Sequence, residues 1–164
     1  MLRNIVLQTI IFLLILGCSS KKLKQEHEQS QVQAAATTDL PINFDPQGSD
    51  SQKINGLNTI HFQYDSSSIP QKERKLLAKN AEWIAGHAKV KVQIEGHCDE
   101  QGSVEYNLAL GDRRAKAAYK FLLDLGVNAK QMATISYGKE KPLSTEDSDE
   151  AQAKNRRVNF VPNR

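Results

Sequence analysis

The sequence predicts an α/β fold in which helices pack on one β-sheet, with the elements in the order βαβαβαβ. Segments in which apolar and polar residues alternate are typical of half-buried strands. Such segments alternate along the chain with others in which apolar residues recur every three or four positions, as in amphipathic helices. The chain has 164 residues and no internal repeat of solenoid length, so we expect a single folded domain.

The first half of this pattern gives a strand, a helix and a second strand. Residues 59–64 form the first strand, which ends at Asp65 and a serine cluster, and Pro70 suits the first turn of the helix. The residues expected on the buried face of this helix are Leu76, Leu77, Asn80, Trp83 and Ile84. The second strand is expected to be half-buried, with an apolar face made by Val90, Val92 and Ile94 and a solvent face made by Lys91, Gln93 and Glu95.

The second half begins with a longer helix. Ser103 suits its N-cap and Gly126 its end. The residues expected on its buried face are Leu110, Ala117, Ala118, Phe121 and Leu125. A third strand over residues 133–137, a short helix over residues 148–155 and a fourth strand over residues 158–161 complete the pattern. Periodicity alone does not give the order of the strands in the sheet.

Residues 1–17 are predicted to be a secretory signal. Arg3 supplies a positive charge, and the apolar run over residues 5–16 would reach about 18 Å as a helix, well short of the ~30 Å hydrocarbon core of a bilayer. The run ends in ILGC, residues 15–18, which resembles the lipobox that precedes a lipid-modified cysteine. We therefore expect lipidation at Cys18; a plain signal peptide with an incidental cysteine is the alternative.

Residues 18–52 are predicted to be the lipidated cysteine and a flexible linker, and residues 53–164 the folded domain. The linker is rich in Gln, Ser, Lys, Thr and Ala and has no sustained period, so it cannot bury enough surface to order itself. It would carry the domain from a membrane to a nearby layer, or it is a tail without a mechanical role. If Cys18 is acylated, Cys98 has no partner for an internal disulfide. The net charge of +3, with acids and bases mixed along the chain, gives no reason to expect nucleic acid as a partner.

The segment EGHCDEQGSVEYNLALGDRRA, residues 95–115, concentrates the reactive side chains. Nucleophilic catalysis is disfavoured because His97 and Cys98 are adjacent in a strand and would point to opposite faces. A metal site is disfavoured because His97 and Asp99 have no second Cys or His cluster to complete a shell. We therefore expect no catalytic residue, no metal and no cofactor.

Recognition of a doubly charged group is the remaining chemistry. Asp99 can accept hydrogen bonds from an ammonium group, and Arg114 can donate two to a carboxylate. The alternative is a surface ion pair worth about 0 to 1 kcal/mol. A helix starting at Ser103 would put Arg114 about 16 Å along its axis, away from Asp99 if the helix leads straight out. Either Gly111, a poor helix former, marks a break, or the chain at residues 102–106 doubles back.

Four motifs stand in order along the chain: EGHCDE, YNLALGDRRA, SYGKEKP at residues 136–142 and KNRR at residues 154–157. With them, residues 59–162 resemble the OmpA-like peptidoglycan-binding domain. The resemblance implies an α/β sandwich with a mixed sheet, and non-enzymatic binding of the diaminopimelate of peptidoglycan stem peptides by Asp99 and Arg114. It adds Asp65, with Ser66 offering backbone amides, and Asn107, for which a structural role in the loop is an equal expectation.

The resemblance is strongest to lipid-anchored members of that family. It implies an outer-membrane lipoprotein whose domain faces the periplasm and works with the Tol system, where the propeller protein TolB competes for an overlapping surface. Ser19, after the lipidated cysteine, resembles the signal for transfer to the outer membrane. Flagellar stators and porins of the same family need a spanning helix or a barrel ahead of the domain. The sequence also leaves open a wall hydrolase that uses Cys98 and a structural lipoprotein without wall binding.

Three further positions bear on the resemblance. Gln101 stands where the lipid-anchored relatives commonly carry an arginine, so the help that charge would give to binding is absent here. Arg156 and Arg157 match the family. For at least one of them we expect an ion pair with an acid such as Asp147 or Asp149.

Overall fold

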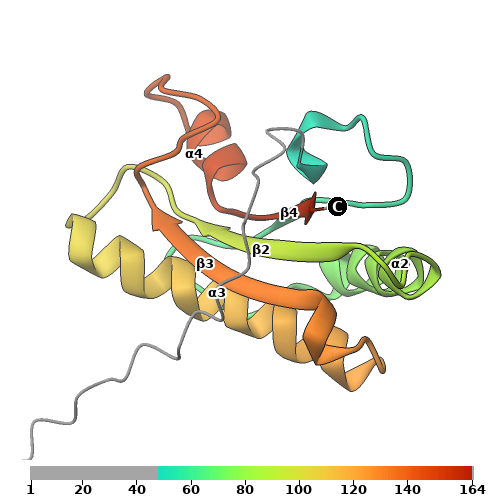
Figure 1. The fold of residues 1–164 in the computed structure, drawn as a ribbon. Coiled ribbons are helices and arrows are strands. Elements are labelled where there is room, and N and C mark those ends of the chain that lie inside the picture. Colours follow the sequence, from blue (N-terminus) through green and yellow to red (C-terminus); the bar gives the residue numbers. More distant parts are fainter. Residues whose placement is uncertain (1–47, 164) are drawn as a thin grey trace, which may run out of the picture. The chain divides into compact units, whose positions relative to one another are not determined.

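The computed structural model describes residues 48–163, so the predicted signal peptide, Cys18 and most of the predicted linker lie outside the described residues. Figure 1 shows one twisted sheet with helices on both of its faces. The helices are α2 (Gln71–Gly86), α3 (Val104–Asp124) and α4 (Asp149–Asn155), and the strands are β1 (Ile60–His61), β2 (Lys91–His97), β3 (Met132–Gly138) and β4 (Arg157–Asn163). Two short 3-10 helices are η1 (Ser49–Ser51) and η2 (Ala129–Gln131).

The strand order in the sheet is β1-β4-β2-β3. Strands β2 and β3 are parallel, and β4 is antiparallel to both of its neighbours, β1 and β2. The predicted βαβαβαβ order and the mixed sheet are therefore confirmed.

The ends of the elements follow local chemistry. The Ser103 hydroxyl accepts a hydrogen bond from the Tyr106 N–H at the start of α3, as an N-cap does, and Gly126 follows the helix with a φ of 89°. Strand β1 is shorter than predicted. The Phe62 N–H still bonds the Arg156 carbonyl, but the chain then turns away at Asp65, where φ is 49°, to reach the start of α2.

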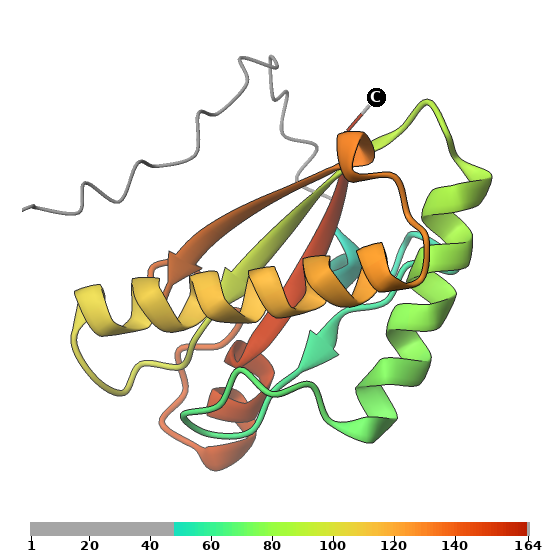
Figure 2. The same cartoon turned by 90° about the horizontal axis from the view of Figure 1, so that it is seen from below.

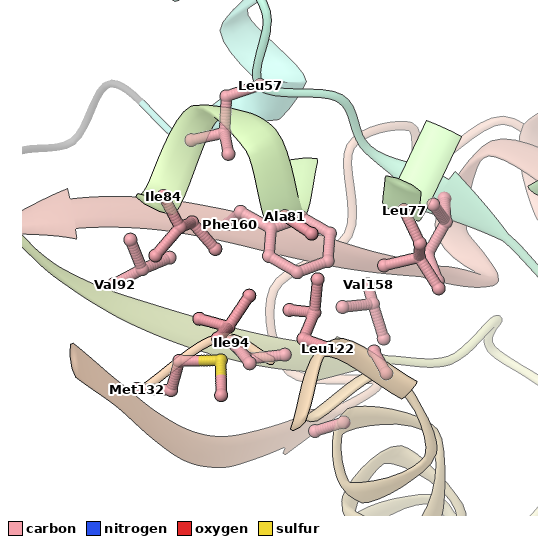
Figure 3. Packing of buried hydrophobic residues seen from close by; sticks show 14 of the residues in the cluster. Leu57, Leu77, Ala81, Ile84, Val92, Ile94, Leu122, Met132, Val158 and Phe160 are labelled. Carbon is pink, nitrogen blue, oxygen red and sulfur yellow. The ribbon is translucent and has the colours of Figure 1, made fainter. Parts of the chain in front are cut away.

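One face of the sheet carries the apolar core. Figure 3 shows Val92 and Ile94 of β2 and Phe160 of β4 packed against side chains of α2 and α3, including Ile84 and Leu122. The buried face predicted for α3 is correct at Leu110 and Ala118, whereas Ala117 and Phe121 are only partly buried. At Leu125 the prediction is wrong, since this side chain is 49% exposed. It caps the C-terminus of α3, where the helix has already run past the sheet.

The opposite face of the sheet is polar, yet it is also buried. Gln93, Glu95 and His97 of β2 are 5%, 7% and 1% exposed, so the prediction of a half-buried strand is wrong. The cover comes from the start of the described chain. Ser49 of η1 donates to the Asn159 side chain and accepts from the Phe160 N–H. Residues 48–52, although predicted as linker, therefore pack against the sheet.

None of the helices within residues 48–163 is both long and apolar enough to cross a membrane.

Candidate functional site

The predicted ligand residues meet at one end of the sheet, where the loop after β1, the loop after β2 and the first turns of α3 converge. A pocket of about 200 Å³ lies there, lined by Tyr64, Asp65, Asp99, Gln101, Gly102, Tyr106, Asn107 and Leu110. Ser66 and Arg114 adjoin it, joined by a hydrogen bond from the Arg114 Nε to the Ser66 carbonyl. All five predicted residues thus belong to one region, but three line the pocket and two stand behind it.

The chain doubles back between β2 and α3, so the length of the helix does not carry Arg114 away from Asp99. Figure 2 shows α3 running back across the sheet as one continuous helix, so a break at Gly111 does not occur. Gly96 and Gly111 instead let the helix approach β2, because a Cβ atom on Gly96 would lie only 1.9 Å from the Gly111 carbonyl oxygen, and one on Gly111 would lie 2.9 Å from the Gly96 carbonyl oxygen. Arg114, one turn further on, is thereby brought to the end of β2.

Arg114 is fully buried and is held by backbone carbonyls of the loop after β1 and of the last residue of β2. Its Nε donates to Ser66 at 2.8 Å, its Nη1 to His97 at 2.9 Å and its Nη2 to Gln63 at 3.1 Å. Burial lowers the pKa of Arg114, but a guanidinium remains charged at neutral pH. Three of the five N–H groups of this side chain therefore brace the loop after β1 against the end of β2.

Asp99 forms an ion pair that the sequence does not predict. Its carboxylate is 2.9 Å from the Arg156 Nη1, and the Arg156 Nε donates to the Phe62 carbonyl. Arg157, the next residue, pairs with Asp50 at 3.4 Å. Both arginines form ion pairs, but the predicted partners at Asp147 and Asp149 are wrong, because α4 separates its two ends by about 10 Å.

Asn107 and Tyr106 organise the rim of the pocket. The buried Asn107 side chain donates to the carbonyls of Gln101 and Ser103, so it holds the loop in the structural role, one of the two expected for it. The Tyr106 hydroxyl donates to the Asp65 carboxylate and ties α3 to the loop after β1. Sequence reasoning missed Tyr106, although it is the first residue of the YNLALGDRRA motif.

Lys139 is a second residue that sequence reasoning missed. Its ammonium group bonds the carbonyls of Glu100 and Gly102 at 3.1 and 3.0 Å and the Glu100 carboxylate at 3.2 Å. It thus ties the loop that carries Asp99 to the segment just after β3. Lys139 belongs to the SYGKEKP motif, but the sequence of the motif does not show which of its residues supports the site.

His97 and Cys98 lack the features of a catalytic pair. The buried Cys98 thiol contacts the Asn107 carbonyl on the α3 side, whereas the His97 ring stacks on Tyr137 on the opposite side of the sheet. Burial raises the pKa of Cys98 and lowers the pKa of His97. A buried thiol with a raised pKa is a poor nucleophile. Among residues 48–163 there is also no cluster of three His, Cys, Asp or Glu side chains able to hold a metal.

Charged groups of both signs gather at this end of the sheet. The carboxylates of Asp65 and Asp99 line the pocket and can accept hydrogen bonds from an ammonium group. The guanidinium group of Arg156 and that of the fully buried Arg114 adjoin the pocket. Loops that are braced by hydrogen bonds hold such groups in place before a ligand arrives.

Residues 61–156 match the sequence profile of the OmpA family. The peptidoglycan-associated lipoprotein of Brucella melitensis is 38% identical over 160 residues, which cover 97% of this chain and 91% of that protein. The peptidoglycan-associated lipoprotein of Pseudomonas aeruginosa is 41% identical over 110 residues, or 67% of this chain and 65% of that protein.

Solved structures give the same likeness. The crystal structure of the peptidoglycan-associated lipoprotein from Burkholderia pseudomallei has a TM-score of 0.62 and 38% identity, covering 64% of this chain and 89% of that one. The C-terminal domain of Helicobacter pylori MotB has a TM-score of 0.63 and 27% identity, covering 66% of this chain and 86% of that one.

Proposed function

The chain belongs to the OmpA family, and from this premise we propose that its folded domain binds the diaminopimelate of peptidoglycan stem peptides without covalent chemistry. The relatives that carry this domain are named for their association with peptidoglycan and for their lipid anchor. The proposal rests on one observation of the site. Two carboxylates line a single pocket at one end of the sheet, and two guanidinium groups adjoin it, so that four separate segments bring charges of both signs together.

The ligand would meet the site as follows. Its ammonium group binds the Asp99 carboxylate, with Asp65 on the facing wall of the pocket. Its carboxylate binds the N–H groups of Arg114 that are not used by the carbonyls of Gln63, Ser66 and His97. Because Arg114 has no exposed surface in the unliganded domain, the loop after β1 has to move aside for this contact. Arg156 already neutralises Asp99, so the ligand joins an existing ion pair rather than a bare buried charge.

At the level of the cell, the protein would tether the outer membrane to the cell wall. Acyl chains on Cys18 hold the membrane, residues 19–52 supply most of the reach, and the domain in the periplasm holds the wall. As part of a Tol system, with TolB and other Tol proteins as partners at an overlapping surface, it would support envelope integrity and cell division. Purely structural anchoring without wall binding is the competing hypothesis.

The test is sedimentation of the full lipidated chain, in detergent, with purified peptidoglycan. The wild-type protein should pellet with the wall, and excess free diaminopimelate should release it. Asp99→Asn keeps the size of the side chain but removes its charge, and should reduce the pelleted fraction at least tenfold. Glu82→Gln removes an exposed carboxylate on α2 and serves as the matched control.

Two results would contradict the proposal. The first is an Asp99→Asn protein that is folded by circular dichroism and still pellets like the wild type. The second is a wild-type protein that pellets but is not released by diaminopimelate, which would move recognition to another part of the wall.

A further inference from the structure

A second pocket lies on the other side of Arg156 from the pocket of Asp99. It has a volume of about 310 Å³ and is lined by His61, Phe62, Gln63, Lys72, Ala153, Lys154 and Arg156. These residues come from the end of β1, the first turn of α2 and the end of α4. Figure 2 shows these segments near one another, where the chain that leaves β1 passes α4 on its way to α2.

This second pocket is basic. Lys72, Lys154 and Arg156 are its charged lining residues, and no aspartate or glutamate lines it. Lys72 has its Nζ 3.6 Å from the neighbouring Glu73 carboxylate, but its side chain is 78% exposed and can turn toward a ligand. Within residues 48–163, Lys154 has no ion-pair partner. Burial lowers the pKa of His61, so near pH 7 this side chain offers a neutral N–H donor.

Arg156 connects the two pockets. It lines the basic pocket, while its Nη1 bonds the Asp99 carboxylate in the first pocket. The backbone makes the same connection, because Gln63 lines the basic pocket and the next residue, Tyr64, lines the first one. Consecutive Cα atoms are about 3.8 Å apart, so a short peptide can reach both pockets.

We propose that the basic pocket binds a second carboxylate of the peptide ligand, carried by the residue next to diaminopimelate. The inference rests on the proposed function and extends it to a neighbouring group. In a stem peptide whose D-glutamate is linked through its side-chain carboxyl, the α-carboxylate stays free directly before diaminopimelate. Amidation of that carboxylate removes its charge, so the pocket would make the domain favour the unamidated peptide.

The test compares three probes by calorimetric titration of the full chain in detergent. The probes are free diaminopimelate, the tripeptide L-Ala-γ-D-Glu-diaminopimelate and the same tripeptide with its D-glutamate α-carboxylate amidated. The wild-type protein should bind the acidic tripeptide at least fivefold more tightly than the amidated one. The double variant Lys72→Gln and Lys154→Gln leaves Arg156 as the one cation among the lining residues, so it should lose most of this preference and bind free diaminopimelate as before. The variant Lys79→Gln and Lys89→Gln, which removes two exposed lysines that do not line the pocket, is the matched control.

The outcomes separate the inference from the function on which it rests. Equal binding of the two tripeptides by the wild-type protein overturns the inference, and so does a preference that survives undiminished in the Lys72 and Lys154 variant. In both cases the proposed function stands if free diaminopimelate still binds and Asp99→Asn abolishes that binding. If the wild-type protein binds none of the three probes, the proposed function itself fails.

Discussion

At the scale of single residues, Arg114 is a proposed ligand-binding residue that also holds the fold together. It is a charged residue with no exposed surface, and its guanidinium is bonded to three backbone carbonyls. Buried charges are tolerated only where hydrogen bonds replace water, and these carbonyls supply them. The same bonds position the loop that carries Asp65. A loss of ligand binding in an Arg114 variant therefore has two causes that must be measured separately.

We predict that Arg114→Ala destabilises the domain by at least about 3 kcal/mol, because three carbonyls lose their donor and a cavity opens in the interior. Arg114→Lys keeps the charge but not the three-way geometry, and should cost roughly half as much. Asp99→Asn should cost less than Arg114→Ala, since Arg156 keeps its bond to the Phe62 carbonyl. Urea unfolding followed by circular dichroism measures all three. An Arg114→Ala protein with a wild-type midpoint would show that the three bonds contribute little to stability.

At the scale of elements, the loops of the candidate site are held in place by hydrogen bonds from neighbouring segments. The loop between β2 and α3 carries Asp99, and Lys139, directly after β3, bonds two of its carbonyls. The Lys139 side chain is 18% exposed, so these bonds are partly shielded from water. Rigid supports of this kind keep a binding group in its productive position and reduce the entropy lost on binding.

We predict that Lys139→Met weakens binding of diaminopimelate about tenfold and changes the free energy of unfolding by less than about 1 kcal/mol, because the bonds it removes lie in a surface loop. Hydrogen–deuterium exchange should speed up at residues 99–103 and stay unchanged in β2. Lys139→Arg should recover much of the affinity. Lys120→Met, at an exposed lysine of α3 far along the helix, is the control. Unchanged exchange in the loop together with full affinity would show that Lys139 does not support the site.

The sequence predicts elements well where local chemistry decides them. Ser103 and Gly126 bound α3 as expected, and the predicted strands fall on the observed ones, although β1 is shorter. The alternation of apolar and polar residues in β2 predicts that Gln93 and Glu95 face solvent, but both are buried. The segment that helps to cover them contains Ser49, which lies more than forty residues earlier in the chain and bonds Asn159 of the neighbouring strand. Burial of a polar face by a distant segment leaves no local signal in the sequence.

The motifs identify most residues of the candidate site, but not the contacts between them. Asp65, Asp99, Asn107 and Arg114 come from motif resemblance, and the fold brings them together, although their contact with a ligand stays a prediction. The partner of Asp99 could not be predicted, because Arg156 is 57 residues away and reaches it only through the pairing of β4 with β1 and β2. The glycine at position 111 is explained by a tertiary contact, the close approach of α3 to Gly96, and not by a break in the helix.

At the scale of the whole molecule, the sheet separates two different interiors. One face is packed with aliphatic and aromatic side chains under α2 and α3, as Figure 3 shows. The other face holds a network in which Asn159 bonds both Ser49 and the Glu95 carboxylate. Apolar burial is nearly independent of pH, whereas a buried polar layer is not. The pH response of stability should therefore come mainly from the second face.

Within this polar layer, we expect His97 to have the largest effect on how stability changes with pH. Neither of its ring nitrogens has a hydrogen-bond partner within residues 48–163, and the Glu95 carboxylate is 3.6 Å from its Nε2, too far for a good hydrogen bond. Burial lowers the pKa of His97 below its ordinary value of 6.5, and Arg157 adds to this effect. The folded protein therefore keeps His97 neutral at a pH where the unfolded chain is already taking up a proton.

We predict that the free energy of unfolding falls as the pH is lowered from about 6.5, until the pH reaches the lowered pKa of His97 in the folded protein. Above about pH 7.5 the free energy of unfolding should not depend on the protonation of His97 or His61. Each histidine contributes a slope of at most about 1.4 kcal/mol per pH unit. His61, whose pKa is also lowered by burial, adds to the slope in the same direction. Urea unfolding between pH 7.5 and 5.5 should give a smaller slope for His97→Gln and the smallest for the double variant with His61→Gln. A wild-type protein whose stability is flat over this range would mean that water or movement of Glu95 stabilises the protonated His97 ring in the folded state.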